Sequence, residues 1–179
     1  MKAEQLSHPT VNSLPHDRSW LLAKAEPTAL FHDSMDRWIG AMVADEHGGG
    51  DGCEDVLVGR IRAKANGIIA GISVVDRLVV EHFPDCTVTW DIIEGDEVES
   101  GDQVLDISGP AVQVLRCERT MLNILGRMSG IATNTASWVS QAGSMGVACT
   151  RKTDWGLLDK WAVHVGGGLT HRLTRADAL

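Results

Sequence analysis

Apolar residues recur at helical spacing in the early part of the chain and then at the alternating spacing of strands. From Thr28, an expected N-cap, apolar positions return every three or four residues as far as the glycines at 48–50, which predicts an amphipathic helix. The preceding residues 1–27 are polar and interrupted by prolines. We therefore expect an N-terminal extension with at most one short helix, near residues 19–25.

The middle of the chain is expected to form short strands around one helix. Asn66-Gly67 separates two alternating runs and is typical of a hairpin turn between them. Two Gly-Asp turns, at Gly95-Asp96 and Gly101-Asp102, indicate further short strands that fold back sharply. The predicted elements are, in order, strand 56–65, strand 68–72, a helix capped by Ser73 and ending near Phe83, strand 87–93 and strand 103–108.

After Gly109-Pro110 the pattern changes to long helical stretches with one short apolar strand. The predicted elements are a helix over 111–142 with a break at Ser129-Gly130, a strand at 147–150 and a helix at 155–163. This order is that of the start of an α/β barrel. We therefore predict an α/β fold: an α/β sandwich domain, 28–110, followed by linking helices and the first part of an incomplete α/β barrel domain, 111–179.

Composition excludes several broad classes of protein. The 179-residue chain is 44% hydrophobic and 22% charged, which is unlike a disordered or collagen-like chain. No apolar run reaches the roughly 18 residues that a membrane helix needs, and residues 1–30 contain no apolar signal-peptide core. We therefore expect a cytoplasmic protein without membrane contacts. The length is also below the about 250 residues of a complete eight-unit α/β barrel.

The spacing of cysteine and histidine predicts no protein-bound metal. The four cysteines lie about thirty residues apart, without a Cys-x-x-Cys pair, and we interpret them as reduced thiols. The seven histidines offer neither an HxxxH nor an HExxH spacing.

Charge is distributed unevenly along the chain. The whole sequence has a net charge of -8, but residues 151–179 contain five Lys and Arg against three Asp and Glu. An acidic protein is a poor general binder of nucleic acid, so this local positive charge points to a small anionic ligand. On charge alone, a solvated helix face is the alternative.

Two short motifs place cations and hydroxyls close together in this basic region. Thr150-Arg151-Lys152-Thr153 follows the predicted strand, at the end where α/β folds bind ligands. His171-Arg172 follows the glycines 166–168, whose main-chain N–H groups we expect to approach an anion. Arginine grips a carboxylate or phosphate with two hydrogen bonds, and lysine supplies a mobile point charge. Taken alone, each motif is also compatible with a solvated strand end or a flexible turn.

Six motifs in order resemble those of one enzyme family. They are Asn66-Gly67-Ile68-Ile69-Ala70-Gly71, Glu94-Gly95-Asp96 with Gly101-Asp102, Cys117-Glu118-Arg119-Thr120 with Leu122-Asn123, Ser129-Gly130-Ile131-Ala132-Thr133, Thr150-Arg151-Lys152-Thr153, and Gly166-Gly167-Gly168 with His171-Arg172. From about residue 28 onward the sequence is similar to the nicotinate-nucleotide pyrophosphorylases, also called quinolinate phosphoribosyltransferases. The resemblance implies a pentosyltransferase that joins quinolinate to phosphoribosyl pyrophosphate. Pyrophosphate and carbon dioxide are released, and the product, nicotinate mononucleotide, serves NAD biosynthesis.

The resemblance also implies a homodimer and roles for individual residues. Lys152 would be catalytic and would face both substrates, and Arg119 would enter the active site of the partner subunit. The implied substrate-binding residues are Arg119, Thr150, Arg151, Lys152, His171 and Arg172. Magnesium would accompany the pyrophosphate group, with its protein ligands expected beyond residue 179.

Three features depart from the family pattern. Residues 154–158 lack the proline and the arginine that usually follow the Arg-Lys-Thr run, which leaves open a paralogue that acts on a different carboxylate. Gly50-Asp51-Gly52-Cys53 has a cysteine where the family has a threonine. The chain ends at Leu179, so we expect it to correspond to the N-terminal two-thirds of the enzyme. A truncated, non-catalytic remnant is the second alternative.

Overall fold

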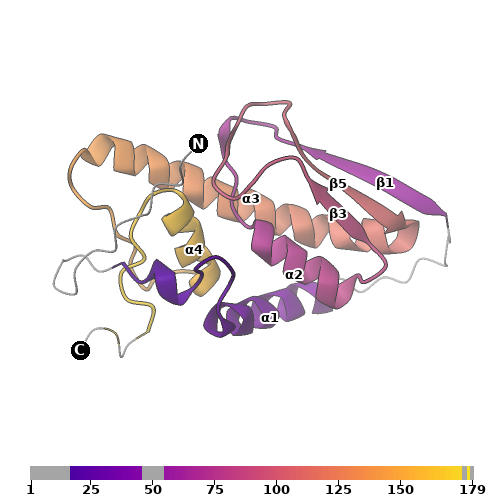
Figure 1. Cartoon of the computed structure of the whole chain (residues 1–179), viewed down its shortest axis with the longest axis horizontal. Helices are drawn as coiled ribbons and strands as arrows, with labels where there is room; N and C mark the ends of the chain where they lie inside the picture. Colours follow the sequence, from indigo (N-terminus) through magenta and orange to yellow (C-terminus); the bar gives the residue numbers. More distant parts are fainter. Residues whose placement is uncertain (1–16, 46–54, 175–176, 178–179) are drawn as a thin grey trace.

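The computed structural model describes residues 17–45, 55–174 and 177, and its mixture of helices and strands confirms the predicted α/β class. The elements are, in chain order, the 3-10 helix η1 (Ser19–Leu21), α1 (Ala29–Ala44), β1 (Val56–Arg62), β2 (Gly67–Ile68), α2 (Ile72–His82), β3 (Thr87–Trp90), β4 (Glu97–Val98), β5 (Gln103–Pro110), α3 (Ala111–Ala142) and α4 (Leu157–Val165). Figure 1 shows the sheet of β1, β5 and β3 toward one end of the long helix α3, and α4 toward its other end. Within the described ranges, no helix is long and apolar enough to cross a membrane. The Gly50-Asp51-Gly52-Cys53 motif lies outside the described residues.

Helix α1 forms where the apolar spacing predicts it. Thr28 is the N-cap residue, and its Oγ1 accepts a hydrogen bond from the Phe31 N–H at 3.4 Å. Phe31, Met35 and Ile39 follow one face of the helix, and each is at most 1% exposed. Both the helix and its cap are therefore confirmed.

Three strands form an antiparallel sheet in the order β1-β5-β3. Strand β1 pairs with β5 from Val56, opposite Pro110, to Arg62, opposite Gln103. The predicted hairpin at Asn66-Gly67 is wrong, because the neighbour of β1 is β5 and the two-residue strand β2 pairs with β4.

Side chains of α3 form hydrogen bonds with the backbone of residues 68–70, where the second strand of the hairpin was expected. The Ile68 N–H donates to Thr133 Oγ1 at 2.8 Å, and the Ala70 N–H donates to Ser129 Oγ at 3.0 Å. Gly67 lies so close to α3 that a Cβ there would be 2.6 Å from Thr133 Oγ1. These N–H groups are therefore not available for pairing with β1, and the segment leads directly into α2.

Helix α2 begins at a cap that a distant residue supplies. The predicted Ser73 cap is wrong: Gly71, with φ of 107°, precedes the helix, and Glu94 accepts the N–H groups of Gly71 and Ile72, each at 2.8 Å. Trp161 of α4 donates its Nε1–H to the same carboxylate at 3.1 Å. Burial raises the pKa of Glu94, and these hydrogen bonds only partly oppose that effect. One carboxylate thus connects α2 with α4.

Helix α3 is a single helix of 32 residues, roughly 48 Å long. The predicted break at Ser129-Gly130 is wrong because the buried face continues through it, from Met128 to Ala132, both at 0% exposure. A glycine inside a helix costs only about 1 kcal/mol relative to alanine, which this packing outweighs. The helix contacts α2, α4, β1, β2 and β5. The domain boundary predicted at Gly109-Pro110 falls at the junction of β5 and α3 and stays a prediction.

A parallel bridge between Ala148 and Leu169 joins the segments that precede and follow α4. The Cys149 N–H donates to the Leu169 carbonyl at 3.1 Å, and the Leu169 N–H donates to the Val147 carbonyl at 2.8 Å. The strand predicted at 147–150 therefore exists only as this bridge. With α4 it forms a strand-helix-strand unit with the parallel pairing of an α/β barrel.

Candidate active site

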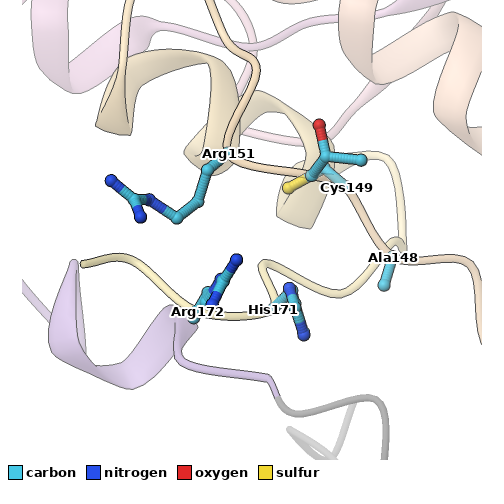
Figure 2. A pocket seen from close by; sticks show the side chains of 6 residues that line it. Ala148, Cys149, Arg151, His171 and Arg172 are labelled. Atoms are coloured by element: carbon cyan, nitrogen blue, oxygen red, sulfur yellow. The ribbon is translucent and has the colours of Figure 1, made fainter. Parts of the chain in front are cut away.

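The parallel bridge brings the two basic motifs to the same edge of the structure. Because the bridged segments run in the same direction, the residues that follow Ala148 and Leu169 leave the unit side by side. A cavity of about 330 Å³ opens there, within the range for a small-molecule site. Its lining residues are Ala148, Cys149, Thr150, Arg151, His171 and Arg172. Figure 2 shows Arg151 on one segment and His171 and Arg172 on the neighbouring one.

The lining of this cavity favours an anion. Two guanidinium groups and one imidazole contribute to it, and none of the six lining residues is acidic. The Nε of Arg172 is buried and has no hydrogen-bond partner among the described residues. Arg151 is exposed, so its fork of N–H donors is open to solvent.

His171 has a backbone conformation that L-residues seldom adopt. Its φ is +53°, and among the described residues it is the only non-glycine residue with a positive φ. Such strain persists only where surrounding contacts hold the backbone, and it is concentrated at functional sites. The preceding Thr170 supplies those contacts: it is 0% exposed, and its N–H and Oγ1 both donate to Asp17 Oδ1, at 3.1 and 3.0 Å.

The glycines at 166–168 do not have the predicted anion-binding role. The N–H groups of Gly166, Gly167 and Gly168 all donate to carbonyls of α4, at 2.9 to 3.1 Å. A Cβ on Gly166 would lie 2.3 Å from the Ala132 carbonyl oxygen, and one on Gly168 would lie 2.7 Å from a Thr135 methyl. These positions need glycine because the chain passes close against α3.

The structure gathers four of the six predicted substrate-binding residues around the cavity, namely Thr150, Arg151, His171 and Arg172. Lys152 is exposed and does not line it, although its N–H donates to Thr150 Oγ1 at 3.0 Å. Arg119 lies on an exposed part of α3, also outside the lining. The roles of both residues stay predictions.

Sequence reasoning overlooked Lys160, a lysine of α4 that is 2% exposed. Its Nζ donates to the carbonyls of Thr150 and Thr170, the residues immediately before Arg151 and His171. The sequence did contain a signal, because Lys160 stands among mostly apolar residues of the predicted helix.

The residues that depart from the family pattern pack away from the cavity. Arg127 of α3 forms a two-point pair with Asp159, at 2.9 and 2.8 Å, and a further contact with Asp154 at 3.1 Å. The hydrogen bond with Asp159 raises the pKa of Arg127. The Arg127 guanidinium lies 4.8 Å over the Trp155 ring, which stacks on Trp38 of α1. Asp154 and Trp155 therefore connect α1, α3 and α4 and do not line the cavity.

The described residues offer no fit for a magnesium ion. In that part of the chain, no three His, Cys, Asp or Glu side chains are grouped so that they hold a metal. The expectation that magnesium ligands lie beyond residue 179 stays a prediction, and we derive no chemical step through the ion.

The chain is an α/β protein in which a strand-helix-strand unit places arginine and histidine around a small cavity at its carboxyl edge, a lining that suits an anion. Two family models match the chain in turn. Quinolinate phosphoribosyl transferase, N-terminal domain, matches residues 52–129, and the C-terminal domain of the same family matches residues 131–179. The two matches meet inside α3, and the chain belongs to the quinolinate phosphoribosyltransferase family.

Individual proteins show the same relationship. A quinolinate phosphoribosyltransferase [decarboxylating] of Nicotiana glauca is 41% identical over 117 residues, which cover 64% of this chain and 33% of the relative. A probable nicotinate-nucleotide pyrophosphorylase of Methanothermobacter thermautotrophicus is 39% identical over 127 residues, which cover 68% of this chain and 45% of the relative. The crystal structure of NadC from Streptococcus pyogenes has a TM-score of 0.74 and 32% identity, over 82% of this chain and 56% of that one. The chain thus spans a third to less than half of these two curated relatives.

Proposed function

We propose that the protein takes part in phosphoribosyl transfer to quinolinate, which forms nicotinate mononucleotide with release of pyrophosphate and carbon dioxide. The observation that carries this proposal is that Arg151, His171 and Arg172 line the same cavity. The relatives named as quinolinate phosphoribosyltransferases and nicotinate-nucleotide pyrophosphorylases support the choice of reaction.

The chemistry of the proposed substrates suits these side chains. Quinolinate carries two carboxylates, and the planar fork of Arg151 or Arg172 matches a carboxylate with two parallel N–H···O bonds. Forming the C–N bond at the ribose needs positioning and charge stabilisation more than a nucleophilic side chain. We assign Lys152, next to Arg151 and exposed, the catalytic role of a mobile cation that reaches both quinolinate and phosphoribosyl pyrophosphate.

We also propose a homodimer in which Arg119 reaches the partner subunit's site. Leu115 and Leu122 flank Arg119 on α3 and are 60% and 42% exposed. Residues three and four apart share a helix face, so an arginine lies between two exposed leucines. Apolar exposure of this kind on a helix supports a subunit interface there. Cytoplasmic location is the remaining part of the proposal; some Nicotiana tabacum relatives are named as mitochondrial.

The alternative of a paralogue for another carboxylate is less well supported by the structure. It was suggested by residues 154–158, but Asp154 and Trp155 pack against Arg127 and Trp38 and are not among the lining residues. Asp154 and Trp155 therefore contribute to the packing between helices and not to the cavity lining. No observation favours a non-catalytic remnant.

The direct test is calorimetric titration of the chain with quinolinate, comparing wild type with Arg151→Lys. Lysine keeps the charge but loses the fork, so we expect at least a tenfold weaker affinity, about 1.4 kcal/mol. Arg60→Lys is the matched control, since Arg60 makes a two-point pair with Asp106 on the exposed sheet face. Equal quinolinate affinity in all three proteins, or none in the wild type, would contradict the proposed function.

A further inference from the structure

Lys160 is a buried charge whose three donors are all used. Its Nζ donates to the Thr170 carbonyl at 2.7 Å, the Thr150 carbonyl at 3.1 Å and Cys149 Sγ at 3.3 Å. An ammonium group has three N–H donors, so these contacts account for each of them. Burying an ammonium is costly even when its hydrogen bonds are made, which calls for a reason why this position holds a lysine.

The acceptors of Lys160 lie on the two segments that carry the cavity's cations. Thr150 precedes Arg151, and Thr170 precedes His171 in the chain. Two backbone hydrogen bonds join these segments at the bridge, and both are made by residues that precede Thr150 and Thr170 in the sequence. Past the bridge, the Lys160 ammonium contacts both segments at once, together with a weaker contact from Cys149 Sγ to the Thr170 carbonyl at 3.3 Å.

We propose that Lys160 is a positioning residue that sets the spacing of Arg151 relative to His171 and Arg172, so that the three side chains act on one anion. The identity of that anion rests on the proposed function, whereas the positioning of the three side chains does not. By holding the Thr170 carbonyl, Lys160 also helps to maintain the left-handed backbone of His171. The competing interpretation is that Lys160 only stabilises the fold as a whole.

Hydrogen exchange measured by NMR separates these interpretations. In Lys160→Met, which keeps the shape and removes the donors, we expect the Cys149 and Leu169 amides to exchange at least about tenfold faster. The amides of Met121 and Ile124, in the buried face of α3, exchange only when the core unfolds, so their rates report any loss of global stability and should accelerate less than those of Cys149 and Leu169. Unchanged exchange at Cys149 and Leu169, or an equal acceleration everywhere, would overturn the proposal. Lys64→Met, at an exposed lysine, is the matched control.

A measurement on the wild type covers the case in which Lys160→Met does not fold. The ammonium protons of Lys160 should give an NMR signal that exchanges slowly with water, unlike those of the exposed Lys64. Ammonium exchange as fast at Lys160 as at Lys64 would show that the contacts with the two carbonyls are absent, and would overturn the proposal.

A double-mutant cycle tests whether Lys160 acts through Arg151. Calorimetric titration with quinolinate should give about tenfold weaker binding for Lys160→Met than for wild type. In an Arg151→Ala background the same change should cost less than about twofold, because the residue being positioned is gone. An equal loss in both backgrounds would show a direct effect of the lysine charge and would refute positioning. Wild-type protein that binds no quinolinate would count against the proposed function, while the exchange measurements would still decide the role of Lys160.

Discussion

Replacing Glu94 by alanine should remove the connection between α2 and α4. The carboxylate accepts the N–H groups of Gly71 and Ile72, and losing a helix cap of this kind costs about 1 kcal/mol. The Nε1–H of Trp161 also loses its acceptor, which costs about 1 to 3 kcal/mol for a buried donor. Relief of the cost of burying the carboxylate offsets part of this sum. We therefore expect Glu94→Ala to lower the free energy of unfolding by about 2 kcal/mol.

Urea denaturation followed by tryptophan fluorescence measures this loss. Glu81→Ala is the matched control because Glu81 is exposed on α2, the helix that Glu94 caps, and pairs with Arg77 at i,i+4 spacing, a contact worth about 0.2 to 0.5 kcal/mol. A loss at Glu94 no larger than that at Glu81 would refute the capping role.

The pH dependence of the same measurement has a definite sign. Burial raises the pKa of Glu94, so the folded state holds this proton more tightly than the unfolded state. The resulting contribution to stability is present in acid and is lost as the pH rises through the folded pKa. The difference in unfolding free energy between wild type and Glu94→Ala should therefore shrink from about pH 4.3, the ordinary glutamate pKa, toward neutral pH. A difference that grows with pH would show that the hydrogen bonds to the carboxylate outweigh its burial.

Two further predictions concern packing and assembly. Gly166→Ala places a Cβ 2.3 Å from the Ala132 carbonyl oxygen and should lower the unfolding free energy by about 1 to 3 kcal/mol. Gly126→Ala, whose Cβ would have no atom within 4 Å, should raise it by about 1 kcal/mol. Equal effects of the two substitutions in thermal denaturation would contradict the close packing against α3. If the exposed leucines of α3 form a subunit interface, the wild type should sediment as a dimer, Leu122→Glu as a monomer, and the control Leu30→Glu on α1 as a dimer. A monomeric wild type would argue against the interface.

Errors in the predicted fold share a physical cause. The hairpin at Asn66-Gly67 is compatible with local turn chemistry. However, the hydroxyls of Thr133 and Ser129 on α3 accept the backbone N–H groups that a second hairpin strand would use for pairing. Likewise, Ser73 is a good local cap, but Glu94, more than twenty residues away, accepts the N–H groups at the start of α2. In each case the competing partner lies in a distant element, and no pattern within a short window contains it.

The amino-acid sequence by itself determined α1, because the spacing of its apolar residues and the Thr28 cap are local properties. It also determined the family, because six motifs in order are specific even where each one alone is weak. Only the tertiary structure decided which residues meet: Arg151 and His171 are twenty positions apart and face one cavity because the chain forms a parallel bridge around α4. Lys160 shows the reason most directly, since the role of a buried ammonium depends on which carbonyls surround it, and those come from two segments that only folding brings together.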